Sequence, residues 1–87
     1  MTIKEFVDEI ATVYQHNRPL FLEGPQNPYS PQKNAVYELR RAASVLLNDA
    51  SEKKRQEVEG AIYLCESFGV INSKEVEHFV HELYKAK

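Results

Sequence analysis

Apolar side chains recur with helical spacing in the first stretch of the chain, residues 3–16. The stripe consists of Ile3, Phe6, Val7, Ile10 and Tyr14, spaced as on one face of an α-helix. Thr2 and Glu5 have the pattern of a capping box, in which each side chain accepts a hydrogen bond from the other residue's backbone N–H. Asn17 and Pro19 interrupt the pattern, so the spacing predicts a helix over residues 3–16.

Helical spacing returns in residues 31–48. Ser30 is a residue type typical of an N-cap, and Pro31 suits the first turn of a helix, where its missing N–H has no partner to lose. The apolar stripe here is Ala35, Val36, Leu39, Ala42, Ala43, Leu46 and Leu47. Its three alanines would let a neighbouring helix approach closely, so we expect a helix over residues 31–48 that packs tightly against another.

Two further stripes follow after short breaks. A helix predicted over residues 51–68 starts near a capping box of Asp49 and Glu52 and stops at Gly69, a residue suited to the left-handed conformation of a helix end. Its inward positions are Val58, Ala61, Ile62, Cys65 and Phe68. The last helix, predicted over residues 73–86, starts at a capping box of Asn72 and Glu75, and its stripe is Val76, Phe79, Val80 and Leu83.

The lengths of the connections indicate how these helices are arranged. The connections between the last three helices, at residues 48–51 and 69–72, are short. We therefore expect these three helices to be antiparallel neighbours. The first connection, residues 17–30, is roughly fourteen residues long, and loops of that length are usually functional or disordered. The sequence therefore predicts one all-α domain over residues 1–87, a small four-helix bundle with a long proline-containing loop after its first helix.

Composition agrees with a small globular protein. The 87 residues are 43% hydrophobic and 28% charged, with a net charge of −2 at pH 7, a balance typical of globular chains. So small a charge provides no overall attraction to nucleic acid or to an anionic membrane. Apolar runs are far shorter than the ~20 residues of a membrane span, and the acidic start of the chain does not resemble a secretory signal. We therefore expect a cytoplasmic protein without membrane contact.

Residues 18–31 depart from the helical pattern. Their apolar triplet, residues 20–22, is expected to pack on the bundle, and prolines then recur every third residue, the period of a polyproline II helix, which is ordered before it binds. One interpretation is that the prolines only stiffen the path to the second helix. The other is that Phe21 and Tyr29 present aromatic rings to a partner. We favour the second for residues 24–31, because the fold does not require so long a connection.

Gly60 is a second departure, because it lies inside a predicted helix on the outward side, where alanine would be more stable by about 1 kcal/mol. The side chains that share this side are Tyr63, Leu64 and Ser67. A bare backbone beside apolar side chains suits close approach by the loop, by the first helix or by a second copy of the chain. Tyr37 and Val45 also lie off their stripe. These positions fit helices buried between neighbours or a homo-oligomer.

Five cations in the middle helices form a third departure: Arg40, Arg41, Lys53, Lys54 and Arg55. The last three lie near the positive end of a helix dipole, where cations are unfavourable. Antiparallel packing of the two helices would gather all five into an anion-binding patch. The interpretation that we favour is that Arg40 and Arg41 pair with Glu57 and Glu59 while the lysines are solvated.

Candidate catalytic and metal-binding residues are few. Cys65 falls on an inward stripe, where a thiol behaves as a small apolar side chain. His78 and His81 are spaced as two ligands on a helix face that points to solvent, but metal sites need three or four ligands and no third is marked. Residues 64–76 partly match a helix-turn-helix, yet the would-be reading helix carries glutamates that would face phosphates. We expect no enzymatic activity, no metal or other cofactor, and no nucleic-acid partner at this segment.

The function that these patterns favour is a small non-enzymatic protein-interaction module of the regulator or inhibitor type. It would present a face of the bundle and the loop of residues 18–31 to a protein partner. Aromatic residues and arginine dominate binding energy at interfaces, which selects as anchors Phe21, Tyr29, Tyr37, Arg41 and Tyr63. The alternative is a binder of nucleic acid or of a phosphate-bearing ligand that uses the five cations.

Overall fold

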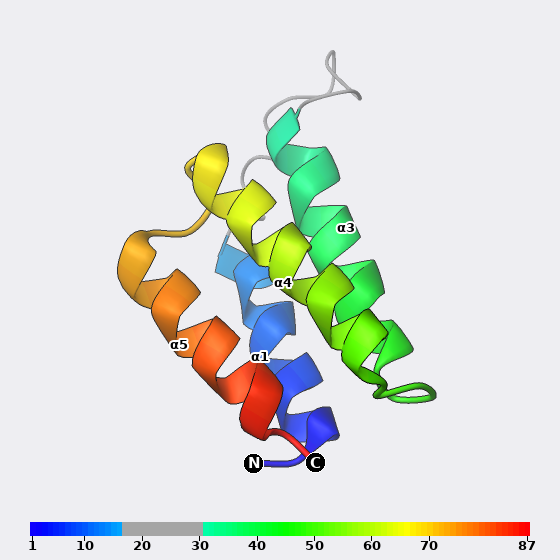
Figure 1. The fold of residues 1–87 in the computed structure, drawn as a ribbon. Coiled ribbons are helices and arrows are strands. Elements are labelled where there is room, and N and C mark those ends of the chain that lie inside the picture. The colour runs from blue at the N-terminus through cyan, green and yellow to red at the C-terminus, as the bar shows by residue number, and fades with distance from the viewer. Residues whose placement is uncertain (17–30) are drawn as a thin grey trace.

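Four helices form the part of the chain that the computed structural model describes, residues 1–16 and 31–87. They are α1 (Ile3–His16), α3 (Pro31–Val45), α4 (Glu52–Ser67) and α5 (Ser73–Lys85). Figure 1 shows them side by side with alternating direction. Each helix packs against two others, α1 on α3, α3 on α4, α4 on α5, and α5 back on α1. The predicted all-α bundle and its antiparallel neighbours are confirmed.

The apolar stripes of all four helices meet in one core. The side chains of Phe6 and Ile10 in α1, Leu39 in α3, Ile62 in α4 and Leu83 in α5 are each at most 2% exposed. Burying a side chain of this size contributes roughly 1.5–3 kcal/mol to folding. Within the described ranges no polar or charged side chain is buried. The bundle is therefore held by apolar packing between amphipathic helices.

Capping residues explain where the helices begin. At α1, Thr2 N donates to Glu5 Oε1 (3.0 Å) and Glu5 N donates to Thr2 Oγ1 (3.1 Å), which confirms the predicted box. The box of Asn72 and Glu75 at α5 is confirmed too. The predicted Asp49–Glu52 box is wrong, because Ser51 is the N-cap of α4 and its Oγ accepts from the backbone N–H at position 54. The predicted N-cap Ser30 lies outside the described residues.

The end of α4 is a Schellman motif built on Gly69. This residue has φ = +75°, in the left-handed region that glycine enters without steric cost. Its N–H donates to the carbonyl of Glu66 (3.0 Å), and Val70 N donates to the carbonyl of Cys65 (2.9 Å), the two bonds that define the motif. The predicted helix stop is confirmed, and the reversal directs the chain into α5.

Two side chains predicted to face inward are instead exposed. Leu47 is 53% exposed because α3 ends at Val45, three residues before the predicted end, and residues 46–48 form a turn. Phe68 is 40% exposed because it is the C-cap of α4, where the backbone leaves the helical conformation. Among the side chains that the structure describes, three outside the predicted stripes are buried: Val13, Ile71 and Ala86. The side chain of Tyr14 lies outside those described.

The two ends of the described structure lie together (Figure 1). Ile3 N donates to the carbonyl of Lys87 (3.2 Å), and Lys87 N donates to the carbonyl of Met1 (3.3 Å). These backbone bonds join the start of α1 to the end of α5 and so close the ring of helices. Among the described helices, none combines the length and the apolar character needed to traverse a bilayer.

Gly60 and Gly69 should respond in opposite directions to alanine. A Cβ built at Gly60 meets no neighbouring atom within 4 Å, so Gly60→Ala should raise the free energy of unfolding by about 1 kcal/mol through helix propensity. Gly69→Ala should lower it by about 1 kcal/mol, because alanine is strained at positive φ. Urea unfolding of dilute protein, followed by circular dichroism, measures both, and two changes of the same sign would contradict this account.

Candidate interaction surface

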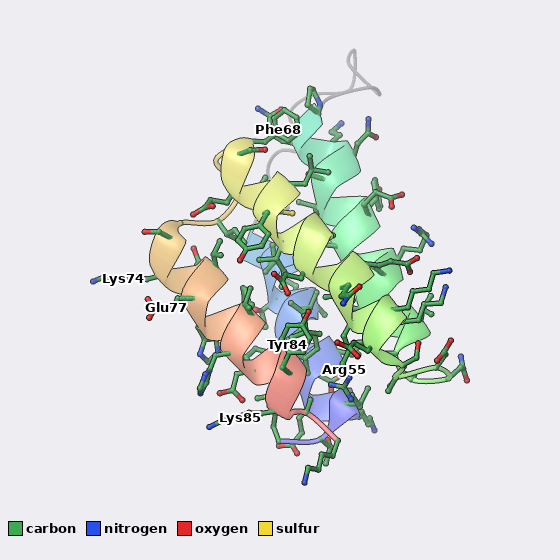
Figure 2. The ribbon with its side chains drawn as sticks, in the orientation of Figure 1. Arg55, Phe68, Lys74, Glu77, Tyr84 and Lys85 are labelled. Atoms are coloured by element: carbon green, nitrogen blue, oxygen red, sulfur yellow. The ribbon has the colours of Figure 1, made fainter. Side chains whose placement is uncertain are left out.

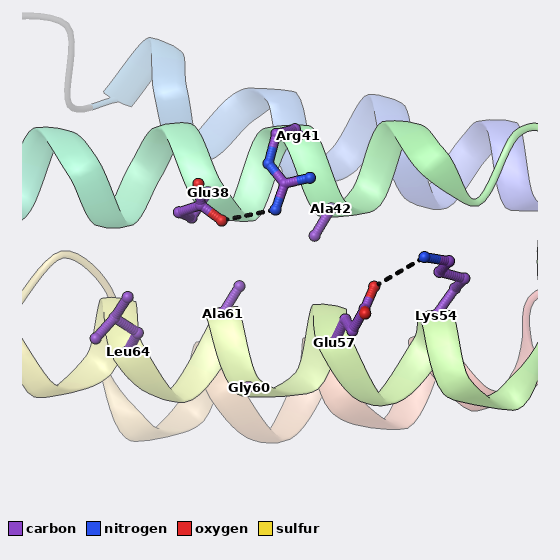
Figure 3. A pocket seen from close by; sticks show the side chains of 8 residues that line it. All are labelled: Glu38, Arg41, Ala42, Lys54, Glu57, Gly60, Ala61 and Leu64. Atoms are coloured by element: carbon purple, nitrogen blue, oxygen red, sulfur yellow. Dashed lines mark hydrogen bonds and ion pairs between the residues drawn. The ribbon is translucent and has the colours of Figure 1, made fainter.

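A shallow groove runs along the outside of the bundle between α3 and α4. It has a volume of about 480 Å³ and is lined by Glu38, Arg41, Ala42, Lys54, Glu57, Gly60, Ala61 and Leu64. Figure 3 shows α3 supplying one wall and α4 the other. We refer to these eight residues as the α3–α4 groove.

Small residues make the floor of the groove. Ala42 and Ala61 are 7% and 9% exposed, and Gly60 has no side chain. Further along the same pair of helices, α3 and α4 approach so closely that the Cys65 thiol of α4 donates to the backbone carbonyl of Ala35 in α3 (3.3 Å). Small side chains thus bring the helices together in the core and leave a hollow above it.

Leu64 is the one large apolar side chain of the groove, and it is 39% exposed. It lies one helical turn after Gly60. Phe68, 40% exposed, lies one turn further and sits where the end of α4 meets the start of α3 (Figure 2). The groove therefore has an apolar side chain beside an open glycine.

Alternating charges form the rim. Arg41 Nη2 donates to Glu38 Oε2 (2.8 Å) on α3, and Lys54 Nζ lies 3.5 Å from Glu57 Oε2 on α4. The hydrogen bond from Arg41 holds the pKa of Glu38 below its ordinary value, and Glu57 adds to the charge stabilisation of Arg41. The expected pairing of Arg41 with Glu57 or Glu59 is corrected to Glu38, the partner one turn earlier on its own helix. The four rim charges sum to zero.

Three of the five predicted partner-binding residues lie in the described structure, on α3 and α4. Arg41 lines it. Tyr37 is 50% exposed and lies one turn before Arg41 on α3. Tyr63 is 47% exposed on α4 but does not line the groove. Phe21 and Tyr29 lie outside the described residues, so their role remains a prediction.

The five cations of the anion-binding alternative face different surroundings. Arg41 and Lys54 line the same groove, each beside a carboxylate. Arg55 turns to α5, where its Nη1 donates to the carbonyl of Leu83 (2.5 Å) and its Nε donates to the carbonyl of Ala50 (3.0 Å) (Figure 2). Arg40 and Lys53 are exposed. The arrangement brings two of the five cations together and uses a third to cap the end of α5.

A second hollow, of about 350 Å³, lies on α5 and is lined by Lys74, Glu77, His78 and His81. His78 Nε2 contacts the Glu9 carboxylate of α1, so this histidine, expected to be merely solvated, bridges two helices. In residues 1–16 and 31–87, no three histidine, cysteine or acidic side chains are placed to hold a metal ion.

Tyr84 and Glu59 join α5 to α4 on the exposed face beside Tyr63. The Tyr84 hydroxyl donates to Glu59 Oε1 (2.5 Å). This hydrogen bond, with smaller effects from desolvation and nearby charge, raises the pKa of Tyr84 to about 12. Glu59, predicted to pair with Arg40 or Arg41, thus accepts a hydrogen bond from Tyr84.

The residues that the sequence patterns did not select as contacts are chiefly Leu64 and the two rim glutamates. The sequence places Leu64 off the stripe beside Gly60, but the composition of protein interfaces favours aromatic and arginine anchors. The rim pairs are readable as opposite charges three residues apart on one helix.

Searches of protein-family models, curated proteins and solved structures found no match to this chain.

Cys65 should be unreactive in the folded protein. Burial raises the pKa of its thiol to about 11 from an ordinary value of 9.0, and the thiolate is the reactive form. An aromatic disulfide reagent at neutral pH should therefore modify Cys65 only after denaturation; rapid modification of the native chain would contradict its burial.

The same shift links stability to alkaline pH. The unfolded thiol ionises at lower pH than the folded one, so the folded state retains the proton and stability falls as pH rises from about 9 to about 11. Two pKa units correspond to roughly 2–3 kcal/mol. The difference in unfolding free energy between the native chain and Cys65→Ala, measured against pH, isolates this loss from that of other groups.

Tyr84 should ionise at higher pH than an ordinary tyrosine, because its hydroxyl donates a hydrogen bond to the Glu59 carboxylate and ionisation would destroy that bond. The difference in tyrosinate absorbance between the native chain and Tyr84→Phe should have a midpoint near 12. The same difference measured in a Glu59→Gln background should return toward 10, the ordinary value. Circular dichroism confirms that the chain is folded at each pH, and a midpoint near 10 in the native background would contradict the hydrogen bond.

Proposed function

We propose that this chain is a non-enzymatic protein-interaction module that binds a protein partner through the α3–α4 groove and the exposed side chains beside it. The observation that carries the proposal is the position of Leu64, which is 39% exposed next to an open Gly60 above a floor of alanines. A partner side chain entering this hollow would contact apolar atoms on several sides.

Leu64 lines the groove, and two more exposed side chains, Tyr37 and Phe68, each lie one helical turn from a residue that lines it. Single exposed apolar residues are ordinary on protein surfaces. Apolar side chains gathered beside a hollow and rimmed by polar groups are typical of interaction sites. Tyr37 and Arg41 add the residue types that contribute most to interface energies.

The charge of the rim favours a protein partner over a polyanion. Arg41 and Lys54 each lie beside a carboxylate, so the groove presents no net positive charge to phosphates. Arg55, the third cation of the proposed patch, is hydrogen-bonded to backbone carbonyls. The nucleic-acid or phosphate-ligand alternative therefore has less support than the protein-interaction proposal.

The loop of residues 18–31 remains part of the proposal through its sequence alone. Its prolines and the rings of Phe21 and Tyr29 are the features that suit a partner. With the exception of Pro31, which begins α3, these residues lie outside the described structure, and the groove is the surface whose geometry supports binding.

A comparison of two charge-introducing variants tests the groove. Leu64→Glu places a charge in the hollow, whereas His81→Glu introduces a glutamate on the exposed side of α5, away from the groove. With each immobilised in a lysate of the source organism, quantitative mass spectrometry should find a protein that the native chain and His81→Glu retain and that Leu64→Glu loses by at least about tenfold.

Retention of the same proteins by all three baits would contradict binding at the groove. Retention of nucleic acid that falls steeply as salt is added would instead support the phosphate-binding alternative, because phosphate contacts release counterions. Circular dichroism of both variants checks that each bait is folded.

A further inference from the structure

We propose that the partner that fills the α3–α4 groove is a second copy of this chain, related to the first by a two-fold axis that passes beside α4. This inference rests on the proposed function and names its partner. Helix α4 carries both the projecting side chain of the groove, Leu64, and the hollow at Gly60.

Leu64 and Gly60 lie on the same exposed side of α4, one helical turn apart. A two-fold axis makes an interface isologous, so that residue i meets residue j and residue j meets residue i. If two α4 helices cross antiparallel at the level of Ile62, Leu64 of each copy faces Gly60 of the other. Each leucine then enters the hollow above the alanines of the opposite groove.

The structure leaves room for this contact. A Cβ at Gly60 would meet nothing within 4 Å in the described chain, and α1, one of the elements considered for this position, packs instead on α3 and α5. The missing side chain lets a second backbone approach α4 closely. Phe68, one turn beyond Leu64, extends the apolar contact along the same helix.

Charge does not oppose association of two copies. The four rim charges alternate and sum to zero, and each acid already has a base one turn away on its own helix. Closing the interface would bury no charge without a counter-charge, which is the costly case. A partner rich in one sign of charge would meet like charges at this rim as often as opposite ones, so the neutral rim favours a neutral surface such as the same face of a second copy.

The proposal predicts a reciprocal rescue. Sedimentation velocity of the full chain, from micromolar to millimolar concentration, should show a monomer–dimer equilibrium. Leu64→Ala removes the projection and Gly60→Leu fills the hollow, so each should raise the dimer dissociation constant by at least about tenfold. The double variant Gly60→Leu/Leu64→Ala exchanges projection and hollow, and its dissociation constant should return to within about tenfold of the native value.

Gly60→Leu also separates this role from a structural one. In dilute solution, where the chain is monomeric, it should unfold at higher urea than the native chain, because leucine favours helix more than glycine does. Weaker association together with a more stable monomer is the expected signature. His81→Glu, away from the groove, is the control and should associate as the native chain does.

A native chain that stays monomeric throughout the concentration range would overturn the inference, as would a dimer that none of the groove variants weakens. If the chain is monomeric and Leu64→Glu still loses a captured host protein, the groove binds a different protein and the proposed function survives. If Leu64→Glu affects neither association nor capture, the inference and the proposed function both fail.

Discussion

The close contact of α3 with α4 through small side chains is the interaction on which the rest of the structure depends. The Cys65 thiol donates a hydrogen bond to the backbone carbonyl of Ala35, a contact that forms only where two helices lie very near each other. Side chains as short as alanine permit that approach. They also leave the outer edge of the interface unfilled, so the α3–α4 groove is a direct consequence of the packing that holds the core.

The opposite side of the bundle is closed by polar contacts. There, where α5 returns to α1, Ile3 N donates to the carbonyl of Lys87, Lys87 N donates to the carbonyl of Met1, and His78 contacts Glu9. These interactions fasten helices whose apolar stripes are already buried. On the side of α3 and α4, by contrast, the outer surface keeps the exposed side chain of Leu64 beside a hollow.

Much of the fold was predictable because its determinants are local. The stripes, two of the three proposed capping boxes and the glycine stop depend on residues within a few positions of one another. The predictions were wrong at two helix ends, where the backbone leaves the helical conformation and exposes Leu47 and Phe68. They were also wrong where a charged side chain could reach more than one partner. The sequence predicts that Arg41 pairs with acids on the neighbouring helix, yet Glu38, one turn away on its own helix, is reached without ordering a second element.

The sequence by itself determined which residues are helical and which side of each helix is apolar, because the 3.6-residue period of an α-helix can be recognised from positions close together in the chain. It also marked Gly60, Tyr37 and Leu64 as residues that the stripes did not use. Only the tertiary structure decided that Gly60 and Leu64 line a groove and that Tyr37 is exposed on the neighbouring helix. Whether an off-stripe side chain is covered depends on which elements pack beside it, and that is set by the fit of the whole core.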